Sequence, residues 1–345
     1  MAAPNILCDC TGMSEKRWLE CREHGPKGDI EYTVGGSDVA VIFGLSPWTT
    51  PLELWMVKKG RMKPKAPPNP KQLLMGHMLE PIAAHFYGLQ TGNTVIDDNH
   101  LYQHANLEYA LANIDRRYIR KEDGESGVLE CKSLTYHKAA DWADGAIPIY
   151  YELQLRYYLA VMDQRHGAFS ALWGNNPEHD LATPHIERDQ AREDIIFEKL
   201  DRWIWSLRHD KPPTMEDVKP KLAMDTLARI YGASKKGLPT IEFPTKFEPQ
   251  LRKIAALQEE NTELKGTIKK NEEAIEAHSV RIAELMKNHE HGILTTTTDK
   301  LLVDFATKVT KRVNSDYLKK EYPSVYAEAL RSSESRKIKV TIQPV

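Results

Sequence analysis

Two carboxylates and a lysine stand at a spacing that could hold a divalent cation and direct a water molecule. Asp115 precedes the segment Glu130-Cys131-Lys132, and the turn EDGESG at 122–127 lies between them. Alternate residues of a strand share a face, so Glu130 and Lys132 would point one way and Cys131 into the core. Folding the chain back at the turn brings Asp115 opposite this pair. Such carboxylates suit Mg²⁺ or Mn²⁺, and a lysine beside the cation can orient a water for attack on phosphorus.

The same residues have an ordinary structural interpretation. A Glu-x-Lys pair on an exposed hairpin forms a surface ion pair, and Asp115 would then be one more exposed carboxylate. An aspartate followed at some distance by E-x-K is a weak pattern that unrelated sequences often match. The elements around the three residues must therefore position them before any chemistry follows.

The mixture of helical stretches and hairpin strands around these residues predicts an α/β or α+β fold with a sheet core. Pro81 lies inside one helical stretch and is expected to kink or restart that helix. A proline-rich break at 63–70 separates that stretch from the helices before it. The expected elements are helices within 14–60, a helix over 71–88, strands over 94–134, a helix over 149–163, a strand over 166–175 and a helix over 186–209.

A long helix is predicted at 248–291, with a coiled-coil seam of more than four heptads. Its seam positions step by three and four residues, and seven of the ten are apolar: Ile254, Leu257, Asn261, Leu264, Ile268, Asn271, Ile275, His278, Ile282 and Leu285. Strands, a short helix near 322–330 and a closing strand at 336–342 should follow. From Lys300 onward the chain carries ten Lys and Arg against five Asp and Glu.

These patterns predict four parts of the chain. They are a catalytic core at 1–210, a linker at 211–247, the coiled-coil helix at 248–291, and a basic strand-helix-strand segment at 292–345. A seam that long needs a partner, because its apolar stripe would otherwise face water. We therefore expect a homo-oligomer or a protein partner at this helix.

Composition excludes several classes of protein. The chain has 345 residues and a net charge of -2, from 47 Lys and Arg against 49 Asp and Glu, so it cannot coat nucleic acid by overall charge. No apolar run approaches the roughly 18 residues of a membrane span. Without a secretory leader, and with only four cysteines, the protein is expected in the cytoplasm. Cys8, Cys10, Cys21 and His24 could supply four zinc ligands, although their spacing is uncommon for a zinc finger.

Several motifs resemble the YqaJ/lambda exonuclease family of the PD-(D/E)XK nuclease superfamily. The resemblance spans about residues 14–175, and a looser match lies at R-V-N-S-D-Y-L-K-K-E-Y-P-S-V-Y, 312–326. The family implies an α/β fold with a restriction-endonuclease-like core, in which helices flank a mixed central sheet. The motifs are W-L-E-C-R (18–22), G-G-S-D-V-A-V-I-F-G-L-S-P-W (35–48), G-H-M-L-E-P (76–81), N-I-D-R-R (113–117), G-V-L-E-C-K-S (127–133) and E-L-Q-L-R-Y-Y-L (152–159).

The resemblance implies a role for each matching position. The metal ligands would be Asp115, Glu130, Glu80 and the backbone carbonyl of Cys131, and Lys132 would be the active-site lysine. The glutamine of the Q-x-x-x-Y element falls on Gln154, with Tyr158 one helical turn further on. Residues that receive a terminal 5′-phosphate would be Arg22 and Ser37, with Tyr158 beside them on the DNA.

Some of these positions have other interpretations. Glu80 could cap a helix restarted by Pro81. Gln154 and Tyr158 could be packing residues of an amphipathic helix, and Arg22 could be an exposed helix charge. Trp48 and Trp55 could stack on a frayed base, although burial under a proline turn is the commoner role of such tryptophans.

The resemblance implies a Mg²⁺-dependent 5′-3′ exonuclease on double-stranded DNA, with Mn²⁺ able to substitute. Its 3′ single-stranded tails would serve phage-type homologous recombination with a single-strand-annealing protein, in the cytoplasm of a bacterial host. The motif chemistry by itself supports only phosphodiester hydrolysis. A restriction-like or repair endonuclease on the same core, and a coiled-coil DNA-binding adaptor, remain as alternatives.

Overall fold

The computed structural model describes residues 3–66, 69–330 and 339. The chain divides into two compact units, Met1–Gly232 and Ala233–Val345, and each is described by itself. The predicted closing strand at 336–342 lies outside the described residues except for Lys339. In the part of the chain that the structure describes, no helix is long and apolar enough to span a bilayer.

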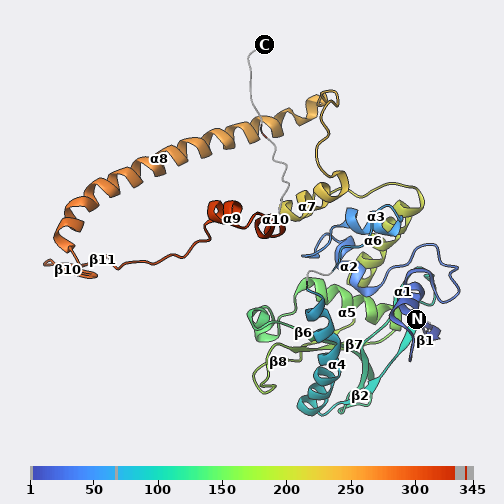
Figure 1. Ribbon diagram of the computed structural model, residues 1–345. Coiled ribbons are helices and arrows are strands. Elements are labelled where there is room, and N and C mark those ends of the chain that lie inside the picture. Colours follow the sequence, from blue (N-terminus) through green and yellow to red (C-terminus); the bar gives the residue numbers. More distant parts are fainter. Residues whose placement is uncertain (1–2, 67–68, 331–338, 340–345) are drawn as a thin grey trace. The chain divides into compact units, whose positions relative to one another are not determined.

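A mixed six-stranded sheet forms the centre of the first unit (Figure 1). β6 and β7 run parallel, and the other pairs in this sheet are antiparallel. The order is β2-β5-β6-β7-β8, and β9 also pairs with β7. The strands are β2 (Thr94–Asp97), β5 (Arg116–Ile119), β6 (Ser126–Ser133), β7 (His166–Leu172), β8 (Leu181–Ala182) and β9 (His185–Glu187).

A second, three-stranded sheet was not expected from the sequence. Its order is β1-β3-β4, and its strands are β1 (Asn5–Asp9), β3 (His100–Gln103) and β4 (Leu111–Ala112). The N-terminal strand has no clear alternation of burial, which explains why its pattern did not predict it.

Helices connect and cover these strands. Three helices form within the predicted stretch 14–60, and α7 is an additional helix at the end of the unit. The helices are α1 (Glu15–His24), α2 (Gly36–Ile42), α3 (Pro51–Lys58), α4 (Pro70–Thr91), the 3₁₀ segment η1 (Tyr136–Gly145), α5 (Ile149–Met162), α6 (Gln190–Arg208) and α7 (Pro220–Tyr231). A parallel pair of strands needs a crossover connection, and η1 with α5 provides it between β6 and β7.

The two faces of the sheet are separate cores. Leu129 and Cys131 of β6 pack with Ala83 and Tyr87 of α4 on one face. On the other face Val128 joins a larger core with residues of α2, α5 and α6. The predicted alternation in β6 is therefore confirmed, and it sends Glu130 and Lys132 to the side opposite α4.

Pro81 does not interrupt its helix. α4 is continuous from Pro70 to Thr91, with Pro81 inside it. Proline removes one hydrogen bond of a helix interior, but the buried side chains of Ala83, Ala84 and Tyr87 hold the following turns against the sheet. The predicted restart of the helix at Pro81 is therefore wrong, because tertiary packing outweighs the tendency of proline to break a helix.

Of the two tryptophans under the proline turn, only Trp55 is buried. Trp48 is 54% exposed and packs edge-on against Tyr150, with 5.2 Å between ring centroids. Burial was the preferred prediction for both, and for Trp48 it is wrong.

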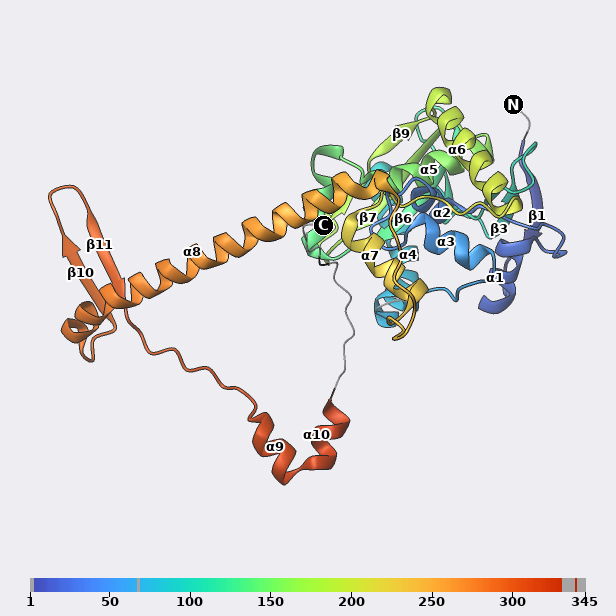
Figure 2. The same ribbon diagram turned by 90° about the horizontal axis from the view of Figure 1, so that it is seen from above.

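The second unit consists of one long helix, a hairpin and short helices (Figure 2). α8 begins at Glu248 and ends at Met286, five residues short of the predicted end. The hairpin pairs β10 with β11 and confirms the return to strands. The elements are the 3₁₀ turn η2 (Thr245–Phe247), α8 (Glu248–Met286), β10 (His291–Thr295), β11 (Lys300–Asp304), α9 (Ser315–Glu321) and α10 (Pro323–Ala329).

Candidate active site

The register of β5 and β6 places Asp115 beside Glu130. Arg116 pairs with Leu129 across the antiparallel ladder, so the residue before Arg116 reaches the level of Glu130. The Asp115 carboxylate accepts a hydrogen bond from the Cys131 backbone N–H, at 2.8 Å. The turn at 122–127 therefore brings the predicted carboxylates together.

Glu130 is the centre of the cluster. It is 2% exposed, and its Oε1 accepts hydrogen bonds from Lys132 Nζ at 2.5 Å and from Gln154 Nε2 at 2.6 Å. Its Oε2 is buried and has no hydrogen-bond partner in the described residues. A buried carboxylate oxygen with no partner is costly, so this atom is available to a ligand.

The charges around Glu130 oppose its ionisation. Burial, the charge of Asp115 and, to a smaller extent, Glu80 raise the pKa of Glu130 to about 8, although Lys132 acts in the other direction. Burial and Asp115 also raise the pKa of Glu80, against the effect of Arg116. Crowded carboxylates of this kind are stabilised when a cation neutralises them.

Lys132 stays charged in this setting. Burial lowers its pKa, but Glu130 and Asp115 raise it by more, so the pKa lies above its ordinary value. Its ammonium lies 5.0 Å from the ring centroid of Tyr151 and 3.4 Å from Gln154 Oε1. Lys132 is thus held as a fixed cation beside Glu130.

α5 supplies the second wall of the site. Gln154 reaches Glu130, and its Nε2 also lies 3.3 Å from the Tyr158 hydroxyl one turn further on. Burial and Glu130 raise the pKa of Tyr158, so its phenol remains protonated. Gln154 and Tyr158 therefore contact the polar cluster from a helix that also packs in the core.

Glu80 and Arg116 close the cluster on the α4 side. Arg116 Nη1 donates to Glu80 Oε1 at 2.7 Å, and its Nε lies 2.8 Å from Asp97 Oδ1. Glu80 is thus an ion-pair partner and does not cap a restarted helix. Arg116 was missed by sequence reasoning, although it lies directly after Asp115 in N-I-D-R-R.

The donor set fits a hard divalent cation. Across the described ranges no three His, Cys, Asp or Glu side chains already form a metal cage. Arg116 holds Glu80 and Lys132 holds Glu130. The free Oε2 of Glu130 and the mutual repulsion of three carboxylates are nevertheless what a Mg²⁺ site presents.

The cysteines near the N-terminus form a different cluster. Cys8 and Cys10 are partly buried and pack near buried Cys21. Burial and the neighbouring thiols raise the pKa of Cys8 to about 12, so this thiol is protonated at neutral pH. His24 Nδ1 lies 3.4 Å from the Ile30 carbonyl oxygen. Among the described residues this group is not arranged as a metal site either.

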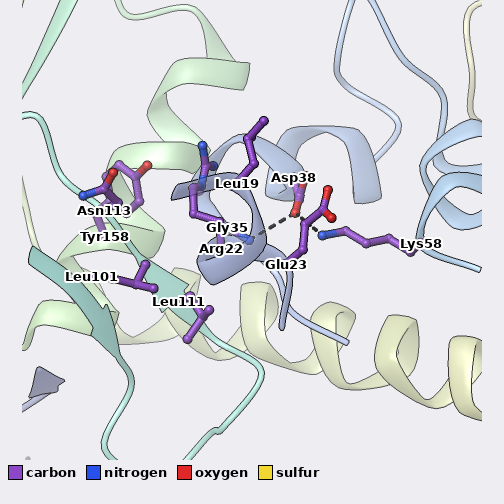
Figure 3. Close-up of a pocket in the computed structure, with 11 residues that line it drawn as sticks. Leu19, Arg22, Glu23, Gly35, Asp38, Lys58, Leu101, Leu111, Asn113 and Tyr158 are labelled. Atoms are coloured by element: carbon purple, nitrogen blue, oxygen red, sulfur yellow. Dashed lines mark hydrogen bonds and ion pairs between the residues drawn. The ribbon is translucent and has the colours of Figure 1, made fainter. Parts of the chain in front are cut away.

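A cavity of about 150 Å³ lies next to the cluster around Glu130 and is lined by Arg22 and Tyr158 (Figure 3). Gly35 and Gly36 line it too, and Gly36 is obligatory there because a Cβ would lie 2.5 Å from the Tyr158 ring. Arg22 stacks on Trp18 at 4.5 Å. The structure thus brings Arg22 and Tyr158 together as expected.

Ser37, which was expected at this cavity, does not line it, whereas Lys58, which was not expected there, does. Ser37 is exposed on α2 and does not line this cavity. Lys58 of α3 does line it, and it lies 3.3 Å from Asp38. Lys58 was missed by sequence reasoning; its only signal was a basic residue in the last turn of a helix.

The part of the chain that holds this site is similar to a known protein family. The model of the YqaJ-like viral recombinase domain matches residues 17–165, a range that holds every predicted site residue. The predicted resemblance is confirmed. The chain is also 26% identical, over 335 residues and 96% of each chain, to the uncharacterized protein YqaJ of Bacillus subtilis (strain 168).

Two solved structures are similar to part of the chain. One is an alkaline exonuclease from Laribacter hongkongensis, with 19% identity, 57% of this chain and 94% of that chain covered, and a TM-score of 0.46. The other is a phage related exonuclease from Haemophilus somnus 129PT, with 15% identity, 50% and 91% covered, and a TM-score of 0.38.

Proposed function

We propose that the protein is a divalent-cation-dependent deoxyribonuclease that digests duplex DNA from its ends. The observation that carries the proposal is the convergence of Asp115, Glu130 and Lys132 at one end of β6, with Glu130 Oε2 left without a partner. The YqaJ-like match supports a role in recombination. The sheet with α4 on one face and α5 on the other would then be a PD-(D/E)XK core.

A cation would be held by Asp115, Glu130, Glu80 and the carbonyl of Cys131. When bound, Mg²⁺, or Mn²⁺ in its place, neutralises charge on the scissile phosphate and lowers the pKa of a nearby water. Binding at Glu80 requires that Arg116 gives up part of its ion pair with that carboxylate. We therefore expect Arg116 to move toward the phosphate when Glu80 takes up its role.

The protein's own groups do the positioning. Lys132 orients the attacking water and stabilises negative charge on the phosphate, because Glu130 keeps its ammonium protonated and fixed. Gln154 holds Glu130 Oε1 from α5, and the Cys131 N–H holds Asp115. Both carboxylates are thus aimed before substrate arrives, which lowers the cost of reaching the transition state.

The neighbouring cavity would receive the terminal 5′-phosphate. Arg22 and Lys58 are the cations there, beside the carboxylates of Glu23 and Asp38, so a phosphate would have to take Lys58 from its ion pair with Asp38. Gly35 and Gly36 let the backbone approach closely. Ser37 retains a role only through its backbone or after a change of rotamer. Cleavage from the 5′ end, which leaves 3′ tails, is what the family resemblance implies.

Degradation from 5′ ends would supply 3′ tails to a single-strand-annealing protein. The reaction would take place in the cytoplasm of a bacterial host that carries a phage or prophage. Homo-oligomerisation of the chain would keep it on one DNA molecule during successive cuts.

The test uses linear and covalently closed circular duplexes, with and without Mg²⁺. We expect Mg²⁺-dependent loss of the linear duplex only, abolished in Lys132→Ala and kept in Lys121→Ala, a matched substitution at an exposed lysine just before the 122–127 turn. Cleavage of the closed circle would favour the endonuclease alternative. Binding without hydrolysis in Mg²⁺ and in Mn²⁺ would favour the adaptor.

A further inference from the structure

The seam of α8 is an apolar stripe on the surface of a single helix. α8 has 39 residues, which is about 58 Å at 1.5 Å per residue. Along the seam, Ile275 is 66% exposed and Leu285 is 81% exposed. The other apolar seam residues exposed in this way are Leu257, Leu264, Ile268 and Ile282. An apolar stripe of this length on a soluble helix marks a contact surface.

The longest helices of the first unit bury part of their apolar surface. α6 buries Ile196, Leu200 and Leu207 in the core of its own unit. α4 packs Ala83 and Tyr87 on the sheet, but it keeps an exposed apolar face that includes Leu73, Leu74 and Met78. The residues of α8 itself therefore have to indicate the occupant of the seam.

The heptad assignment follows from the spacing. Ile254, Asn261, Ile268, Ile275 and Ile282 are at position a, and Leu257, Leu264, Asn271, His278 and Leu285 are at position d. Polar residues at a or d cost stability unless they meet one another, so they restrict the register of pairing.

We propose that a second copy of this chain covers the seam, with the two α8 helices antiparallel and centred between Lys269 and Lys270. In this register each a residue faces a d residue of the other copy. Five kinds of layer result, and each occurs twice. They are Ile254 with Leu285, Leu257 with Ile282, Leu264 with Ile275, Asn261 with His278 and, at the centre, Ile268 with Asn271.

The polar layers are compatible with this direction but do not select it. Asn261 meets His278, and an amide and an imidazole can hydrogen-bond, whereas Asn271 faces Ile268. A parallel dimer in register would instead place Asn261, Asn271 and His278 each against its own copy, and two asparagine amides can also hydrogen-bond.

The charges beside the seam favour the antiparallel direction. In the antiparallel register Glu260 faces Arg281 and Lys265 faces Glu272 of the second copy, which gives four attractive pairs in the dimer. A parallel dimer would make only the two Glu260–Lys265 pairs. The ion pairs within α8 join other residues, Arg252 with Glu248 and Lys269 with Glu273, so these four side chains are not committed to them.

The first experiment measures direction by disulfide formation. Leu264→Cys chains are mixed with size-tagged Ile275→Cys chains under mild oxidation, and wild-type chains with Cys8, Cys10, Cys21 and Cys131 serve as the background control. We expect covalent dimers only in the mixture, because residues 264 and 275 share a layer. In the antiparallel dimer two copies of residue 264 are about 16 Å apart along the axis, beyond the reach of roughly 7 Å for a disulfide.

The second experiment measures the dimer dissociation constant by sedimentation. Lys265→Glu makes two pairs repulsive and should raise the constant about tenfold. Adding Glu272→Lys in the same chain should restore it to within about threefold of wild type. Glu259→Lys, at the outward f position of the preceding heptad, is the matched control and should leave it unchanged.

Each result decides the proposal. A wild-type mass of twice 39.4 kDa that halves in Ile268→Asp with Ile275→Asp supports a dimer through α8. A monomeric wild type, or a mass that the two aspartates do not change, would overturn it. Self-linking of Leu264→Cys alone, or rescue of Lys265→Glu by Glu260→Lys in place of Glu272→Lys, would show a parallel dimer and also overturn it. None of these readouts depends on nuclease activity.

Discussion

The two units of the chain solve the burial of apolar side chains in different ways. In the first, two cores lie on the two faces of one sheet and enclose rings such as Tyr157 and Phe169. In the second, Met286 is the one apolar side chain that is buried, among the residues that the structure describes. A unit with a core can hold reactive groups in a fixed geometry. A unit without one presents its apolar surface to something else.

The largest expected effect separates hydrolysis, which depends on the first unit, from assembly, which depends on the second. Glu130→Gln keeps the size of the side chain but removes a cation ligand, and we expect hydrolysis to fall by about 10³-fold or more. Its mass in solution should stay that of wild type. Glu122→Gln, in the exposed turn before β6, is the control. Residual activity within tenfold of wild type would show that Glu130 is not a ligand.

The same division predicts unequal costs for one substitution. Leu200→Ala, in the core, should lower the free energy of unfolding by about 2–5 kcal/mol. Leu264→Ala, on α8 and outside that core, should lower the free energy of unfolding of the first unit by less than about 0.5 kcal/mol. All seven tryptophans lie before residue 206, so tryptophan fluorescence in urea reports the first unit alone. Equal losses would mean that α8 is part of the same cooperative unit.

A smaller effect is expected where the cavity meets a DNA end. Duplexes with 5′-phosphates should be degraded faster than those with 5′-hydroxyls, and Arg22→Ala should reduce that preference about tenfold. Arg17→Ala, on the same helix but paired with Glu20, is the matched control. Single-turnover rates on both substrates give the ratio. A ratio of one in the wild type would remove the phosphate-binding role.

The smallest predicted effect concerns the pH dependence of stability in the first unit. Burial raises the pKa of Asp98, but hydrogen bonds from Tyr102, Arg117 and His100 lower it by more, so its folded pKa lies below the ordinary value. Its stabilisation is therefore present above the unfolded pKa of about 3.9 and is lost as pH falls through the folded pKa.

Asp98→Asn should thus be less stable than wild type at pH 7, with a difference that shrinks as the pH falls below about 4. Urea unfolding at several pH values measures it. A difference that is constant over this range would show that the carboxylate charge has no part in the network.

Sequence reasoning located the reactive cluster because strand alternation is a local property. Glu130 and Lys132 had to share a face, and the short turn at 122–127 left little freedom in how Asp115 met them. Motif resemblance added Gln154, which is 24 residues from Glu130 and reaches it only through the crossover. The roles of these residues stay predictions, whereas their proximity is observed.

Other features depended on tertiary contacts that no local pattern encodes. Lys58 lines the cavity only because α3 packs beside α2. β1 exists because β3 pairs with it from almost a hundred residues away. α7 is held by Arg229 and Thr226, which contact buried Glu53 of α3. The exposed ring of Trp48 likewise depends on where Tyr150 lies.

The crossover from β6 to β7 has a consequence for the order in which the chain acquires its groups during synthesis. Asp115, Glu130 and Lys132 leave the ribosome before Gln154 and Tyr158, and α5 packs on α2, which has already emerged, as well as on β6 and β7. Contacts between residues distant in sequence form late, after loop closure has been overcome. A nascent chain therefore lacks the Gln154 side of the cluster until α5 has emerged.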